Sequence, residues 1–190
     1  MTDASRRDFL KRGGLVLTGF GLEPLSGIRL FASPQPQVIE MRSNTLGSRV
    51  WFDPIGLFVM PGTTVRWIAR ENVHTTTAYH PNNDHHSLRI PESAVPWDSG
   101  FLVKPGATFE VTLKVPGVYD YYCMPHEAAG MVGRIVVGAA LGPGTQAFDY
   151  WAGKPGTESW RRVPDAARSA FPSVKRILAE HVVHPDGGPK

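Results

Sequence analysis

The only cysteine of this 190-residue chain lies in residues 121–131, which read Tyr121-Tyr122-Cys123-Met124-Pro125-His126-Glu127-Ala128-Ala129-Gly130-Met131. An imidazole, His126, follows the thiol by three residues, and a thioether, Met131, lies five residues further on. Soft sulfur and imidazole donors favour copper over magnesium, calcium or manganese. A trigonal copper site with two imidazoles needs a second histidine, and His74, at the end of an apolar stretch, can supply it. The candidate metal ligands are therefore His74, Cys123, His126 and Met131.

The order of residues around Cys123 argues against a purely structural role. An isolated cysteine is more often a small buried hydrophobic residue, and a lone methionine or histidine is more often structural. Here an aromatic strand over residues 118–122 leads directly to Cys123. Pro125 then stiffens the turn, and Gly130 permits a tight return into a second strand that runs through Val137. A core cysteine does not require a histidine and a methionine at the two ends of such a loop, so the pattern predicts a ligand loop between two strands.

Strand signals dominate the chain up to Gly138. Residues 108–115 alternate polar and apolar side chains, which is typical of a half-buried antiparallel strand. Pro-Gly pairs at 61–62, 105–106 and 116–117 mark turns. Many short strands separated by such turns favour an all-β sandwich. The expected strands are Val38–Arg42, Val50–Phe52, Gly56–Val59, Thr64–Ala69, His74–Tyr79, Phe101–Val103, Thr108–Val115, Val118–Cys123 and Val132–Val137.

The spacing Cys123-x-x-His126-x-x-x-x-Met131, between Gly117–Tyr122 and Val132–Val137, resembles the copper loop of the cupredoxins plastocyanin, pseudoazurin and halocyanin. The resemblance spans about Val38–Gly138. It implies a Greek-key β-sandwich, one type 1 (blue) copper ion per chain, and one-electron transfer. The family often has an asparagine directly after the first histidine ligand, whereas this chain has Thr75-Thr76-Thr77.

The resemblance also assigns roles to the ligands. It implies that His126 is the ligand nearest solvent and the route for the electron. It also implies that Met131 is a weak axial donor that helps to set the reduction potential of the copper. We therefore expect an electron carrier, not an enzyme, that meets its redox partner proteins in brief encounters.

Two other functions stay open at this point. In a copper enzyme, His80, His85 and His86 complete a substrate-accessible site, or Glu127 replaces Met131 as a ligand. Such an enzyme needs an open coordination position and a pocket. The other alternative is a copper carrier or sensor, which needs a site that releases its metal readily.

The amino-terminal residues 1–32 read as a twin-arginine (Tat) export signal. Ser5-Arg6-Arg7-Asp8-Phe9-Leu10-Lys11 precedes a short, weakly apolar run over residues 13–22. Glu23-Pro24 interrupts that run well short of the ~20 residues that span a bilayer. We expect cleavage after Ala32 and a periplasmic or other extracytoplasmic location, with membrane association only if the segment is retained.

The charge of the chain does not favour a polyanionic partner. The formal net charge is +3, but residues 1–32 contribute five basic and three acidic residues, so the remaining chain carries about +1. A nearly neutral chain gives no basis for a nucleic-acid-binding patch.

Two segments extend the expected cupredoxin domain, residues 33–138. Residues 80–100 form a loop of about 21 residues, longer than the ~12–15 usual in compact domains. Its histidines are expected to be solvated surface residues, with a second metal site or a pH-sensitive surface as the alternative. Residues 139–190 form a carboxyl-terminal extension with a linker-like start. A short helix is expected from about Pro172, and a first turn before that residue is left open. The apolar face of that helix is expected to dock on the sandwich or on a second subunit.

Overall fold

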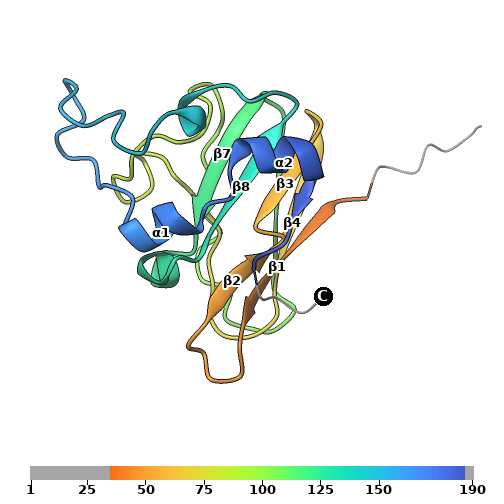
Figure 1. Ribbon diagram of the computed structural model, residues 1–190. Coiled ribbons are helices and arrows are strands. Elements are labelled where there is room, and N and C mark those ends of the chain that lie inside the picture. The colour runs from red at the N-terminus through yellow and green to blue at the C-terminus, as the bar shows by residue number, and fades with distance from the viewer. Residues whose placement is uncertain (1–34, 187–190) are drawn as a thin grey trace, which may run out of the picture. The chain divides into compact units, whose positions relative to one another are not determined.

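The computed structural model describes residues 35–186, which form two facing β-sheets and a carboxyl-terminal extension packed on them (Figure 1). One sheet has the strand order β2-β1-β4-β6 and the other β5-β7-β8-β3-β9. The predicted all-β sandwich with a short helical extension is confirmed. The strands are β1 Gln37–Ser43, β2 Val50–Asp53, β3 Gly56–Val59, β4 Thr63–Ala69, β5 Thr77–Ala78, β6 Thr108–Leu113, β7 Gly117–Tyr122, β8 Val132–Val137 and β9 Val182–Val183.

The helical elements are short and lie outside the two sheets. They are the 3-10 helices η1 Met124–Ala129 and η2 Pro143–Thr145 and the α-helices α1 Asp165–Ala170 and α2 Val174–Glu180. Within residues 35–186, no helix is long and apolar enough to cross a membrane. The twin-arginine segment predicted for residues 1–32 lies outside the described residues.

The core forms where alternating side chains of the two sheets meet. In β4, Val65, Trp67 and Ala69 are fully buried, as period-2 alternation requires of a strand with one face inward. The Trp67 ring meets the Tyr121 ring of β7 edge-on, with centroids 5.4 Å apart, so one aromatic contact joins the two sheets. Such edge-to-face contacts add to the stabilisation that comes from burying the rings.

Of the predicted strands, Thr108–Val115 ends early, at Leu113, and two others form little or no strand. The segment expected over His74–Tyr79 contains only β5. The strand expected over Phe101–Val103 is absent, and Leu102 makes a single bridge with His74 in its place. The strand at His74–Tyr79 is short because two of its backbone N–H groups donate to side chains. Thr75 N donates to the Cys123 sulfur and Thr76 N donates to a serine hydroxyl, so neither is free for a β-ladder.

The long loop, residues 80–100, is anchored without a helix of its own. The Asn83 side-chain amide donates to the carbonyl oxygens of Ala78 and Trp97, at 2.8 and 3.0 Å, which holds the two ends of the loop together. Long ordered loops commonly need such local anchoring, because their backbone groups have no ladder partners.

The extension forms a short helix on each side of Pro172. A helix was expected from about Pro172, with a first turn before it left open. Helix α2 follows Pro172, and the Ser173 hydroxyl accepts a hydrogen bond from Arg176 N as its N-cap. A second helix, α1, precedes Pro172, which cannot continue a helix that begins before it. The side chain of Ile177 packs against Gly56 of β3, so α2 docks on the sandwich, as Figure 1 shows. The short strand β9 then pairs with β3 and was not predicted.

A buried carboxylate joins the sheet, the long loop and the extension. Asp120 of β7 accepts hydrogen bonds from Arg89 and from Arg134 of β8, each with a shortest distance of 2.7 Å. The two arginines also donate to carbonyl oxygens of the extension, Arg89 to Gly144 and Arg134 to Pro172, both at 3.0 Å. Burial tends to lower the pKa of Arg134, but the charge and hydrogen bonds of Asp120 outweigh it and raise that pKa.

We expect Asp120→Ala to lower the free energy of unfolding by about 3–5 kcal/mol, because it leaves two buried guanidinium groups without their counter-ion. Urea unfolding of the full chain measures this change. Glu110→Ala is the control, because Glu110 pairs with Arg66 on the surface, where such pairs contribute ~0–1 kcal/mol. Equal losses in the two variants would contradict the role assigned to the buried carboxylate.

Candidate metal centre

The loop between β7 and β8 brings three of the four candidate ligands to one end of the sandwich. Cys123 follows β7, its N–H donates to the Met131 carbonyl at 3.0 Å, and its carbonyl accepts from His126 N at 2.9 Å. Pro125 lies in the first turn of the 3-10 helix η1, and Gly130 ends the helix with φ 85°, a conformation that favours glycine. The loop is thus closed by backbone hydrogen bonds at both ends.

Helix α1 of the extension packs against this loop. A side chain at Gly130 would place its Cβ 3.2 Å from the Ala166 carbonyl oxygen and 3.5 Å from the Ala170 methyl. Glycine at this position therefore permits both the turn and the close approach of α1. The carboxyl-terminal extension is part of the support of the ligand loop.

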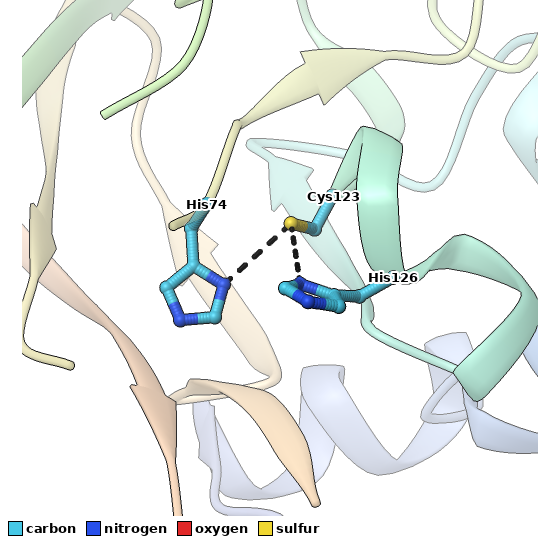
Figure 2. A group of neighbouring side chains, drawn as sticks. All are labelled: His74, Cys123 and His126. Atoms are coloured by element: carbon cyan, nitrogen blue, oxygen red, sulfur yellow. Dashed lines mark hydrogen bonds between the residues drawn. The ribbon is translucent and has the colours of Figure 1, made fainter. Parts of the chain in front are cut away.

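The side chains of His74, Cys123 and His126 converge on one point (Figure 2). The Cys123 Sγ atom lies 3.6 Å from His74 Nδ1 and 3.3 Å from His126 Nδ1. The three donor atoms lie within 4.8 Å of one another. The two imidazole rings meet edge-on at 61°, so both turn Nδ1 toward the sulfur without stacking. Cys123 and His74 are fully buried, whereas His126 keeps partial contact with solvent.

Thr75 links the two segments that carry the ligands. Its hydroxyl accepts a hydrogen bond from Met124 N at 2.7 Å, and its N–H donates to Cys123 Sγ at 3.3 Å. The sequence showed a threonine where the related family often has an asparagine. In the structure, Thr75 itself supplies the connection between the segments of His74 and Cys123.

The environment of Cys123 keeps the free thiol protonated. Burial raises its pKa to about 12, although hydrogen bonds from Thr75 and from the His126 backbone work in the opposite direction. A buried thiol becomes a thiolate when a bound cation compensates its charge. The site therefore favours the thiolate only together with a metal ion.

The two histidines are held in the form that binds metals. Burial, and then the nearby His126, lower the pKa of His74 to about 4, against a smaller opposing contribution from the Glu71 backbone. Burial also lowers the pKa of His126. Both imidazoles are therefore neutral at neutral pH, which is the protonation state of a metal-ligating histidine.

Met131 is hydrogen-bonded through its backbone to two of these residues, Cys123 and His126. Its side chain is fully buried in the same core cluster as Cys123, and its N–H donates to the His126 carbonyl at 3.1 Å. The backbone thus places Met131 at the closing end of the ligand loop.

The other histidines near His74 do not form a second metal cluster among the described residues. His80 Nδ1 accepts a hydrogen bond from Asn82 N, and His85 is exposed. His86 was expected on the surface with them, but it is buried and hydrogen-bonded to Glu127. The prediction of a solvated histidine was therefore wrong for His86, because a buried acidic partner cannot be recognised from the loop sequence.

Comparisons with known proteins agree with this arrangement. Residues 39–138, more than half of the chain, match the family of copper binding proteins of the plastocyanin/azurin type. The chain belongs to this family.

Individual relatives support the same assignment. A chloroplastic plastocyanin from Hordeum vulgare is 47% identical over an alignment that covers 27% of this chain and 39% of that protein. The chain spans less than half the length of the plastocyanins it matches. A pseudoazurin structure from Sinorhizobium is 27% identical with a TM-score of 0.51, and the match covers 76% of this chain and 94% of that one. A pseudoazurin from Methylobacterium extorquens has a TM-score of 0.50 at 17% identity, which shows a shared fold.

Copper fits this cupredoxin chain on chemical grounds as well. One thiol sulfur and two neutral imidazole nitrogens form a soft donor set of the kind that copper prefers. Among the histidine, cysteine and acidic side chains of residues 35–186, these three have donor atoms close enough together to hold one metal ion. The copper cofactor expected from the sequence is confirmed by the family match together with this donor set.

The lowered pKa of His74 makes the stability of the copper-free protein depend on pH. Below pH 6.5 the unfolded chain takes up a proton at His74, but the folded chain does not do so until about pH 4. The free energy of unfolding should therefore fall as the pH is lowered from 6.5 to about 4. Urea unfolding across this range measures the effect, and His74→Gln should make the dependence shallower. An equally steep dependence in that variant would contradict the assignment.

Proposed function

We propose that this protein is an exported one-electron carrier with one type 1 copper ion, bound by His74, Cys123 and His126 with Met131 as a weak axial ligand. The observation that carries the proposal is the convergence of the two Nδ1 atoms on the Cys123 sulfur. Family membership supports the proposal, since members of the cupredoxin family carry electrons.

The residues of the site are arranged to hold a metal ion rigidly. When bound, copper supplies the one-electron oxidation and reduction between Cu(II) and Cu(I). Thr75 fixes the sulfur through a backbone N–H, and such hydrogen bonds to the sulfur tune the potential. The closed loop between β7 and β8 holds Cys123 and His126 in fixed positions, so little has to move when an electron arrives or leaves.

The partial exposure of His126 indicates the route by which electrons reach and leave the metal. His126 is the one member of the histidine–cysteine set that is not fully buried, and Met124 beside it is 39% exposed. A small apolar surface around a partly exposed ligand suits a brief contact with a redox partner protein. We therefore propose that electrons enter and leave through His126.

Burial also favours a carrier over a copper enzyme. The side chains of Cys123 and His74 have no exposed surface, so a substrate would have to displace the protein to reach a metal between them. Both oxygens of Glu127 are hydrogen-bonded, to Tyr79 and His86, and Glu127 is not in the ligand cluster. An enzyme that used Glu127 in place of Met131 gains no support from this arrangement.

The proposed location depends on the sequence of the amino terminus. Arg6-Arg7 and the weakly apolar residues after them support export through the twin-arginine route to the periplasm or another extracytoplasmic compartment. Proteins of this route cross the membrane folded, which suits a chain whose metal ligands come from distant segments.

The purified mature protein should bind one copper ion per chain and show intense visible absorption when oxidised. The absorption arises from charge transfer between the Cys123 sulfur and Cu(II), so Cys123→Ser should abolish the colour. Metal analysis with visible and EPR spectra tests this prediction. Stoichiometric copper in a colourless oxidised wild type would show that no sulfur–copper bond forms.

Met131→Leu should keep the colour and shift the reduction potential, because the axial donor tunes the potential without supplying the charge-transfer band. Met60→Leu is a matched control, since Met60 is 63% exposed and lies outside the ligand loop. Protein-film voltammetry and visible spectra measure both variants. A potential and spectrum unchanged in Met131→Leu would rule out the axial assignment.

A further inference from the structure

A buried polar cluster lies directly beside the proposed copper ligands. It consists of Tyr79, His86, Tyr122 and Glu127, each at most 6% exposed. The Tyr79 hydroxyl donates to Glu127 Oε1 at 2.6 Å, and His86 Nε2 lies 3.0 Å from Glu127 Oε2. The Tyr122 hydroxyl lies 3.1 Å from His86 Nδ1. The electron-carrier function described above does not use these groups.

The orientation of His86 within the cluster is fixed on both sides of its ring. His86 Nδ1 lies 2.9 Å from the Asn83 carbonyl, which can only accept, so Nδ1 carries a proton. The opposite nitrogen faces Glu127. The ring also stacks on Tyr122 with centroids 4.3 Å apart. These contacts make His86 a rigid part of the long loop, residues 80–100.

The cluster holds the chain on both sides of the Cys123–His126 pair. Tyr122 is the residue before Cys123, and Glu127 is the residue after His126. Glu127 lies in the 3-10 turn that carries His126, and its own carbonyl accepts the hydrogen bond of Gly130 N that ends the turn. A displacement of Glu127 therefore has to move the backbone of His126.

The extension packs on the two tyrosines of the cluster, whose members are almost fully buried. Tyr79 and Tyr122 pack with Val163 and Ala167 of the extension in one buried cluster, and the Phe171 ring lies 6.0 Å from the Tyr79 ring. A buried carboxylate is costly unless its hydrogen bonds are satisfied. In such surroundings the satisfied bonds are strong and favour one arrangement over others.

We propose that Glu127, held by His86 and Tyr79, is a positioning residue that fixes His126 relative to Cys123. This inference rests on the proposed function, because it assigns Glu127 a role through a proposed ligand. It also gives a role to the long loop and to the extension. His86 of the loop and Tyr79 just before the loop hydrogen-bond the carboxylate, and the extension packs on Tyr79. A purely structural cluster would stabilise the fold without influencing the ligand geometry.

The decisive variants are Glu127→Ala and Glu127→Gln in the full mature chain. Glu127→Ala removes both hydrogen bonds. Glu127→Gln keeps the size of the side chain and can still accept from Tyr79 and donate to His86 Nε2. If Glu127 positions His126, Glu127→Ala should bind copper with a shifted reduction potential and altered Cu(II) EPR and visible spectra, and Glu127→Gln should lie nearer to wild type. A Glu127→Gln variant as altered as Glu127→Ala would overturn the positioning role.

Hydrogen exchange in the copper-free protein gives a readout that does not depend on the metal. The N–H groups of His126, Gly130 and Met131 close the ligand loop. Loss of a hydrogen-bonded buried anchor should speed their exchange about tenfold or more in Glu127→Ala. Glu92→Ala is the matched control, because Glu92 is an exposed acid in the same long loop, and it should leave the exchange and the spectra unchanged.

Tyr79→Phe covers the case in which Glu127→Ala does not fold. This substitution removes one hydroxyl and keeps the ring, so a smaller change of the same kind in potential and loop exchange supports the proposal. Variants that unfold at lower temperature but keep the wild-type potential, spectra and loop exchange overturn it. That result leaves the electron-carrier function intact, whereas a colourless wild type overturns the function itself.

Discussion

The antiparallel pairing of β7 with β8 is the constraint on which the metal centre depends. It sets Cys123 opposite Met131 and leaves a loop of fixed length between them, in which His126 has to fall. The remaining histidine comes from a segment about 50 residues earlier, and Thr75 binds that segment to the loop through the sulfur and through Met124 N. The soft donor set is thus assembled by a strand pair and one cross-link.

Buried charge connects this centre to the parts that extend the cupredoxin core. Asp120 joins the sheet to the extension through two arginines, and Glu127 joins the ligand loop to the long loop through His86 and Tyr79. Each carboxylate is costly to bury alone, so each stabilises only the arrangement in which its partners are in place. The long loop and the extension therefore support the copper site from two sides, which a minimal sandwich would not require.

The accuracy of the sequence predictions depended on the range of the interactions involved. The strands from Val132 to Val137 and from Gly56 to Val59 were predicted with the bounds that the structure has, because apolar alternation and turn residues are local signals. The strand expected at His74–Tyr79 was too long, since hydrogen bonds to distant side chains replace its ladder. Strand β9 was missed because two residues carry no periodic signal.

The sequence by itself determined the all-β class, through its strand and turn signals. It also determined the family and the resemblance of the ligand loop to the copper loop of cupredoxins, because a single cysteine with a histidine and a methionine at this spacing leaves few other interpretations. Only the tertiary structure decided which groups surround that loop. It showed that Thr75 links the ligand segments, that His86 is buried on Glu127, and that the extension packs on Tyr79 and Tyr122 beside them. Such partners are separated by tens of residues along the chain, and their contact arises from packing, which no local pattern records.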